Sequence, residues 1–159
     1  MLFRSIVELV GQAVAQTGRI ARGLAPVETS GEGLSAALRR LAEDVEDLYG
    51  VTCRCEIGRN VAIRDRAKST QLFRIAQEAV NNAVRHSGCG RIVVELRGGG
   101  KKRILTVSDD GKGLARAAGR SDGMGLRIME HRARMIGGSL RVASGKASGT
   151  VVVCTLPTA

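Results

Sequence analysis

Residues 77–86 read QEAVNNAVRH, and two glycine turns follow them, DDGKGL at 109–114 and DGMGL at 122–126. Each piece alone is weak evidence, because an isolated Gly-x-Gly is more often an ordinary turn than part of a nucleotide site. A helix with polar residues at fixed spacing, followed by two such turns, is a more specific combination. The three pieces together therefore direct the search for function to this helix and these turns.

A polar stripe runs along the helix predicted at 68–86. Glu78 and Asn82 lie four residues apart and share one helical face, which Arg74 and Arg85 extend in both directions. The other side is apolar and contains Leu72, Ile75, Ala76, Ala79, Val80 and Ala83. A solvated polar face is the plain alternative, but the glycine turns give the stripe a chemical use. The Asn82 oxygen suits Mg²⁺ as a single protein ligand, and Glu78 could orient or deprotonate an attacking group.

The first glycine turn follows a strand predicted at 103–108 and begins at Asp109. A carboxylate there, beside glycines that let a flat ring approach, can accept a hydrogen bond from an exocyclic amine. That geometry suits adenine. Because an ordinary hairpin turn can have the same sequence, the turn alone would favour the hairpin interpretation.

The second glycine turn opens a predicted helix whose apolar residues recur at helical spacing: Leu126, Met129, Ala133 and Ile136. Gly123 and Gly125 therefore lie at a helix N-terminus, where free amide groups and the helix dipole favour phosphate. The residues between the turns, 114–122, are small and basic in character. We interpret them as a short lid over the phosphates, with a plain surface loop as the alternative.

The whole pattern predicts an α+β fold, a two-layer α/β sandwich with a mixed sheet and helices on one face. Strands are expected at 51–57, 91–97, 103–108, 139–144 and 150–156, with a turn at 98–100. An earlier helix is expected to belong to the same domain and to end at Gly50, with one apolar face made of Leu34, Leu38, Leu41, Val45 and Leu48.

Residues 1–26 are predicted to form an amphipathic helix ahead of a domain at 27–159, and the family resemblance given below implies that this helix is the end of a dimerisation helix. Apolar and small residues recur there at alternating spacings of four and three, and Pro26 ends the run: Phe3, Val7, Val10, Val14, Thr17, Ala21 and Leu24. A helix with such a seam needs a partner. We expect a homodimer through residues 3–24, and packing onto its own domain is the alternative.

Charge and composition narrow the function classes. Residues 1–50 carry five basic and seven acidic side chains, and residues 51–159 carry 20 and 8, which gives −2 and +12 and sums to +10. The basic residues are scattered and aromatic residues are few, so we expect no direct nucleic-acid binding but rather ATP and acidic protein partners. The four cysteines lack zinc spacing and are expected to be free thiols. With no secretory signal and no apolar run that could span a membrane, we expect a cytoplasmic domain, which a membrane-bound parent could carry.

These motifs resemble the ATP-binding catalytic domain of sensor histidine kinases. That superfamily also contains gyrase, heat-shock chaperone ATPases and mismatch-repair ATPases, and its fold is called the Bergerat fold. The stretch at 72–83, LFRIAQEAVNNA, is similar to the asparagine box of the subfamily that pairs with helix-turn-helix response regulators. The resemblance covers roughly residues 25–157 and implies ATP and Mg²⁺ as ligands.

The resemblance also implies a role for each matching residue. Glu78 would be the catalytic base or orienting group, Asn82 the magnesium ligand and Asp109 the acceptor for the adenine amine. The other residues expected to contact nucleotide are Arg85, His86, Gly111, Gly113, Leu114, Gly123, Met124, Gly125, Leu126 and Thr150. The implied partners are a dimerisation domain that carries the acceptor histidine and the receiver domain of a response regulator.

One departure from the family pattern stands beside these matches. The family phosphorylates a histidine on a dimerisation helix, whereas the two histidines of this sequence, His86 and His131, lie elsewhere. The sequence therefore predicts a histidine kinase catalytic domain that does not phosphorylate itself as this chain. A serine kinase of the anti-sigma-factor type and a non-catalytic ATP-binding regulatory module are the alternatives.

Overall fold

The computed structural model describes residues 33–59, 61–113, 124–145 and 148–157. The helical elements within these ranges are α2 (Gly33–Tyr49), α3 (Arg66–Asn82), the π-helix η1 (Ala83–Ser87) and α4 (Met124–Met135). The strands are β1 (Thr52–Ile57), β2 (Arg91–Gly99), β3 (Lys102–Asp109), β4 (Ser139–Ser144) and β5 (Thr150–Pro157). The predicted α+β class is confirmed. The predicted dimerisation helix lies outside the described residues.

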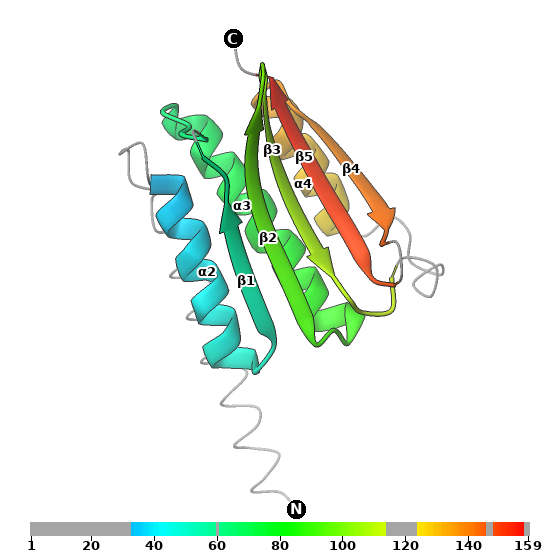
Figure 1. Ribbon diagram of the computed structural model, residues 1–159. Helices are drawn as coiled ribbons and strands as arrows, with labels where there is room; N and C mark the ends of the chain where they lie inside the picture. The colour runs from blue at the N-terminus through cyan, green and yellow to red at the C-terminus, as the bar shows by residue number, and fades with distance from the viewer. Residues whose placement is uncertain (1–32, 60, 114–123, 146–147, 158–159) are drawn as a thin grey trace, which may run out of the picture.

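The described strands form one mixed sheet in the order β1-β2-β3-β5-β4. β1 and β2 run parallel, and every other neighbouring pair is antiparallel. A parallel pair needs a crossover connection, which α3 supplies between β1 and β2. In Figure 1, α3 and α4 pass behind the sheet and α2 flanks β1, so the helices form a second layer on one side.

The core lies between the sheet and the helices. Alternate residues of β2 point inward, and Ile92, Val94 and Leu96 are buried as the sequence pattern predicts. α2 contributes Leu34, Leu38 and Val45 to the same core, which confirms that this helix belongs to the domain. The largest fully buried side chains are Leu38, Leu72, Ile75, Ile92, Leu96, Leu105, Val80, Val94 and Cys154.

Two cysteine thiols are part of this core. Burial raises the pKa of Cys53 to about 12 and that of Cys154 to about 11. Both thiols are therefore protonated at neutral pH and behave as small apolar groups. All four cysteines are free in the structure, as expected from their spacing.

Most element boundaries shift by one or two residues from the sequence prediction, and the helix predicted to reach residue 86 ends at Asn82 and continues as the π-helix η1; two differences have a clear physical cause. α3 begins at Arg66 rather than at residue 68, because the Asp65 carboxylate caps the helix by accepting a hydrogen bond from the Lys68 backbone N–H at 3.1 Å. The turn predicted at 98–100 is wrong, because Gly98 and Gly99 continue β2 and pair with Arg103 and Lys102 of β3. The connection between β2 and β3 is therefore shorter than the predicted turn, and it begins at Gly100, whose φ is 54°.

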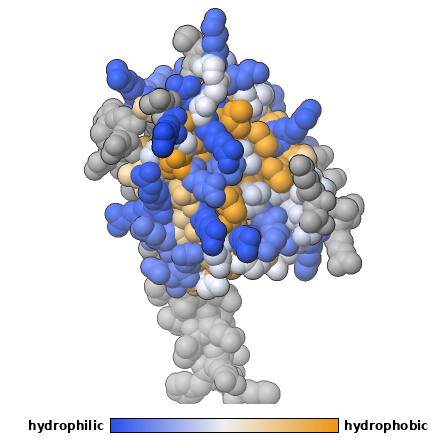
Figure 2. Space-filling model, viewed as in Figure 1, coloured by the Kyte–Doolittle hydropathy of each residue, from blue (hydrophilic) through white to orange (hydrophobic). Residues whose placement is uncertain are grey.

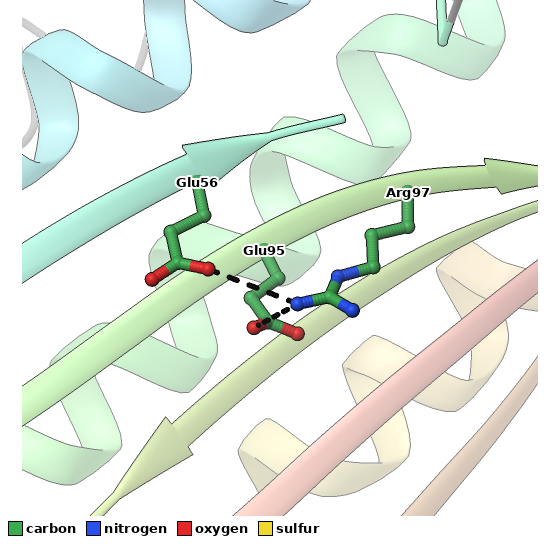
Figure 3. A network of polar contacts seen from close by, with 3 residues as sticks. All are labelled: Glu56, Glu95 and Arg97. Atoms are coloured by element: carbon green, nitrogen blue, oxygen red, sulfur yellow. Dashed lines mark hydrogen bonds and ion pairs between the residues drawn. The ribbon is translucent and has the colours of Figure 1, made fainter. Parts of the chain in front are cut away.

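The face of the sheet opposite the helices carries both charged and hydrophobic side chains (Figure 2). On this face Glu56 of β1 and Glu95 of β2 lie directly opposite each other in the parallel register. One nitrogen of the Arg97 guanidinium contacts both of them, at 2.9 Å from the Glu95 carboxylate and 3.8 Å from that of Glu56 (Figure 3). The arginine offsets the repulsion of two adjacent like charges, although exposure to water keeps its contribution small.

Candidate nucleotide-binding site

The first glycine turn packs closely against the residues just before β5, where the Ser148 hydroxyl also donates a hydrogen bond to the Asp110 carbonyl oxygen at 3.2 Å. A Cβ atom added to Gly149, whose φ is 81°, would overlap the Asp109 carbonyl oxygen and lie 3.0 Å from the Asp110 Cα. A Cβ atom on Gly113, whose φ is 71°, would lie 2.8 Å from the Gly149 carbonyl oxygen. Glycine at these positions lets the end of β3 and the start of β5 pack closely. The structure thereby brings Thr150, the first residue of β5, next to the Asp109 turn.

Asp109 and Asp110 are adjacent in sequence but have different surroundings. The half-buried Asp109 accepts one hydrogen bond through Oδ1, from the Gly111 backbone N–H at 2.9 Å. Among the described residues no donor reaches its Oδ2 atom, which can accept a hydrogen bond from a ligand amine. The adenine-binding role of Asp109 stays a prediction.

Asp110 is a structural residue. Its Oδ1 atom accepts hydrogen bonds from the backbone N–H groups of Gly90 and Arg91, both at 2.9 Å. These bonds, that from Arg91 first, hold the pKa of the Asp110 carboxyl below its usual range. The exposed carboxylate thus joins the end of β3 to the start of β2. The sequence analysis singled out Asp109 and gave Asp110 no role, because the partners of Asp110 are backbone groups far away in the sequence.

Ser87, the last residue of η1, joins the first glycine turn to the end of the long helix. Its hydroxyl donates to the Ala83 carbonyl oxygen at 2.7 Å and accepts from the Cys89 backbone N–H at 3.1 Å. Its carbonyl oxygen accepts from the Lys112 backbone N–H at 2.9 Å. A Cβ atom on Gly111 would overlap Ser87, so glycine is required for this contact. Sequence reasoning missed Ser87, and the Ser-Gly pair at the helix end was the only available signal.

The second glycine turn reaches the polar stripe of α3. A Cβ atom on Gly125 would overlap the Glu78 Oε1 atom and lie 3.4 Å from the Asn82 Nδ2 atom. The first turn of α4 therefore rests directly on Glu78 and Asn82, both of which are half-buried. Within the described part of the chain neither side chain is engaged in a hydrogen bond, so their polar atoms are available to a ligand.

The other predicted site residues divide into two groups. Arg85 and His86 are exposed on η1, and at the start of α4 Met124 is 79% exposed whereas Leu126 is half-buried. Leu114, Gly123 and the predicted lid at 114–122 lie outside the described residues. The described helices include none that is long and apolar enough to cross a membrane.

The arrangement fits a divalent cation that is held mainly by its substrate. No group of three or more metal-ligating His, Cys, Asp or Glu side chains occurs in the described ranges. Asn82 offers one amide oxygen beside the Glu78 carboxylate, and Gly125 adds no side chain there. Mg²⁺ commonly binds in this manner, with one or two protein oxygens and the rest from phosphates and water.

A two-layer sandwich with glycine turns at one helix end defines a class of nucleotide-binding domain. Comparison with known proteins identifies the family to which this domain belongs. The chain belongs to the family of histidine kinase-, DNA gyrase B- and HSP90-like ATPases, whose model matches residues 67–159. The curated proteins to which the chain is similar include sensor histidine kinases.

Two of the similar curated proteins are sensor histidine kinases. The chain is 32% identical to the sensor histidine kinase MctS of Rhizobium johnstonii over 155 residues, which are 95% of this chain and 33% of that protein. It is 30% identical to the sensor histidine kinase LiaS of Bacillus subtilis over 154 residues, which are 97% of this chain and 42% of that protein. The chain thus spans between a third and a half of the length of these relatives.

Solved structures share the fold. The ATP-binding domain of PrrB from Mycobacterium tuberculosis superposes with a TM-score of 0.67 at 19% identity, over 79% of this chain and 94% of that one. The structure of full-length ShkA in complex with AMPPNP superposes with a TM-score of 0.66 at 21% identity, over 85% of this chain and 31% of that one. At these identities the likeness supports the two-layer architecture.

Proposed function

We propose that this domain binds ATP with Mg²⁺ and transfers the γ-phosphoryl group to a histidine on a separate dimerisation domain of a two-component kinase. The observation that carries the proposal is the contact of Gly125 with Glu78 and Asn82. It places a helix N-terminus, a carboxylate and an amide at one point, which are the groups that bind phosphate, move a proton and hold a cation.

The phosphoryl end of the nucleotide lies at α4 in this proposal. Backbone N–H groups at the start of α4 would face the phosphates, and Asn82 would hold the cation. Mg²⁺ supplies positive charge that offsets the charge developing on the transferred group. Arg85, His86, Leu114, Gly123, Met124 and Leu126 are proposed to surround the phosphates, with 114–122 closing over them.

Glu78 is proposed as the general base or orienting group. A ring nitrogen of the acceptor histidine attacks the γ-phosphorus as the bond to the leaving oxygen of ADP breaks, and Glu78 accepts the proton that the other ring nitrogen loses. The free carboxylate beside the start of α4 is suitably placed for this exchange.

The adenine end of the nucleotide lies at the first glycine turn. Asp109 Oδ2 accepts a hydrogen bond from the exocyclic amine, and the lack of side chains at Gly111 and Gly113 leaves space for the ring. Thr150 flanks the ring at the start of β5. Ser87 holds this turn against η1, so both ends of the site are connected through one short segment.

The partners are proposed from the same family membership. A dimerisation domain supplies the histidine, a response regulator with a helix-turn-helix output domain receives the phosphoryl group, and residues 3–24 form a homodimer seam. The domain is proposed to work in the cytoplasm, as part of a membrane-bound parent or alone. His86 and His131 are not proposed as acceptors, so the isolated chain is expected to bind ATP without labelling itself.

The test is phosphoryl transfer from γ-labelled ATP to a supplied dimerisation domain that contains histidine. An acid-labile, base-stable product is expected, and Glu78→Gln should reduce its rate about 10²–10⁴-fold while leaving ATP affinity nearly unchanged. An acid-stable product on serine would contradict the proposal and favour a serine kinase. Labelling of the chain alone that disappears in His86→Ala or His131→Ala would make it a self-sufficient kinase.

A further inference from the structure

Two arginines, one on α3 and one on α4, are each held by a glutamine side chain of α3. Arg74 of α3 donates from Nη1 to the Gln77 Oε1 atom at 3.3 Å, and Arg132 of α4 donates from Nη1 to the Gln71 Oε1 atom at 2.8 Å. Both side chains are half-buried. In the described ranges no carboxylate lies within ion-pair distance of either guanidinium.

The two guanidinium groups are close enough to affect each other. The pKa of Arg74 is lowered, first by burial and then by the positive charge of Arg132. Arg97 and Arg134, by contrast, lie against carboxylates of their own. Two neighbouring positive charges that are held by neutral amides repel each other. An anion bound beside both of them would offset this repulsion and would therefore be stabilised there.

The position of the pair indicates which anion it would meet. α3 and α4 run antiparallel, because Gly125 contacts Glu78 near one end while Arg132 contacts Gln71 near the other. A helix rises about 1.5 Å per residue, so Arg74 lies about 6 Å along the axis from Glu78 and about 12 Å from Asn82. An anion there lies about one to two helical turns from the proton acceptor and well away from the proposed cation ligand.

The surface beside Arg132 suits a protein rather than a small ion. Ile128 and Met135 of α4 are 39% and 61% exposed, and they lie four residues before and three residues after Arg132. Residues at these spacings share a helical face. A basic centre between two exposed apolar side chains complements an amphipathic helix that carries an acidic residue.

We propose that Arg74 and Arg132 bind a carboxylate side chain on the helix that presents the acceptor histidine, one to two turns from that histidine. This inference rests on the proposed function, because it uses Glu78 as the place of transfer. Arg74 and Arg132 would then be positioning residues, which set the register of the acceptor helix along α3 and α4 and leave nucleotide binding to the other residues.

The test compares two labelled helical peptides that differ only in charge. Both carry one central histidine; the first has glutamate at positions four and seven residues to either side, and the second has glutamine there. Fluorescence anisotropy with the full chain, with and without a non-hydrolysable ATP analogue, gives the affinities. A charged hydrogen-bonded pair predicts about tenfold tighter binding of the glutamate peptide.

Substitutions of the pair should remove this preference. Arg74→Met and Arg132→Met keep the aliphatic stem but lose the charge, and each is expected to bring the two peptides within about twofold of each other. Arg74→Lys and Arg132→Lys keep the charge without the planar fork and should show an intermediate preference. The matched control is Arg134→Met on the same helix, whose guanidinium pairs with Glu130, and it should retain the full preference.

Three results would overturn the inference: equal binding of both peptides by the parent chain, a preference that survives in both Met variants, or a Met variant that weakens ATP as much as it weakens the peptide. The last result would assign the pair to the nucleotide. ATP affinity is measured separately by calorimetry, and peptide binding is also measured without nucleotide. Failure of ATP binding therefore counts against the proposed function, whereas loss of charge preference counts against this pair alone.

Discussion

Substituting Gly125 by alanine separates the stability of this domain from its activity. The added Cβ atom would overlap the Glu78 Oε1 atom and lie 3.3 Å from the Glu78 Cδ atom. The obstacle is the end of a flexible side chain, so Glu78 can rotate away with little strain on the backbone. Alanine also favours a helix over glycine by about 0.5–1 kcal/mol. We therefore expect the free energy of unfolding of Gly125→Ala to equal or exceed that of the parent.

Phosphoryl transfer should respond in the opposite direction. Moving a catalytic group by about 1 Å costs on the order of 10²-fold in rate, and the methyl group also fills space beside Asn82. Gly125→Ala should therefore lose about two orders of magnitude in transfer, equivalent to about 2.7 kcal/mol at the transition state.

The assay combines thermal unfolding with transfer from labelled ATP to a supplied dimerisation domain. Gly99→Ala is the matched control, because an added Cβ atom there meets nothing within 4 Å and the glycine does not need a positive φ. It should leave transfer unchanged. Normal transfer by a folded Gly125→Ala variant would refute the assignment of α4, Glu78 and Asn82 to the phosphoryl end of the site.

Three further predictions concern other parts of the domain. Gly149→Ala should destabilise the fold by several kcal/mol in denaturant titration, because its Cβ atom would overlap the Asp109 backbone. The control Gly137→Ala shares the positive φ but has open space around it, so it should cost only about 1 kcal/mol. Equal losses in the two variants would show that the close contact is unimportant. Asp109→Ala should weaken ATP binding by about 1.5–3 kcal/mol, and the parent should bind GTP poorly; equal ATP and GTP affinities in calorimetry would contradict the adenine assignment. The folded pKa values of Cys53 and Cys154, about 12 and about 11, exceed those of the unfolded chain, so both thiols stabilise the fold fully below about pH 9. Above pH 9 the free energy of unfolding should fall by up to about 1.4 kcal/mol per pH unit for each thiol. A Cys53→Ala variant whose stability has the same pH slope as the parent would argue against this prediction.

Much of the fold follows from periodicity in the sequence. The alternation of Ile92, Val94 and Leu96 and the helical spacing of Leu34 and Leu38 report burial on one face, and the structure buries these residues. The turn at 98–100 was misplaced because a triple glycine marks backbone freedom without specifying register. Register here follows from strand pairing, which joins Gly99 to Lys102.

Several residues of the candidate site could be proposed from the sequence, whereas the contacts that join them could not. Glu78, Asn82 and Gly125 could be proposed from spacing and glycine turns, and the structure brings them into contact. Asp110 and Ser87 were missed because their importance comes from backbone groups far away in sequence, at Gly90, Arg91 and Lys112. Such contacts depend on tertiary packing and leave no local periodic signal.

The close contact between Gly111 and Ser87 limits how the sequence of this domain can change during evolution. The segment proposed to recognise the base is joined at Ser87 to the end of the helix that carries the proposed base Glu78, through the Ser87 side chain and its carbonyl oxygen. A lineage that changes its base preference by reshaping that joint would also shift the geometry of transfer. Substitutions should therefore be tolerated more easily in the strands of the open sheet face than in the five residues from Ala83 to Ser87. A change in those five residues would affect base preference and the geometry of transfer together.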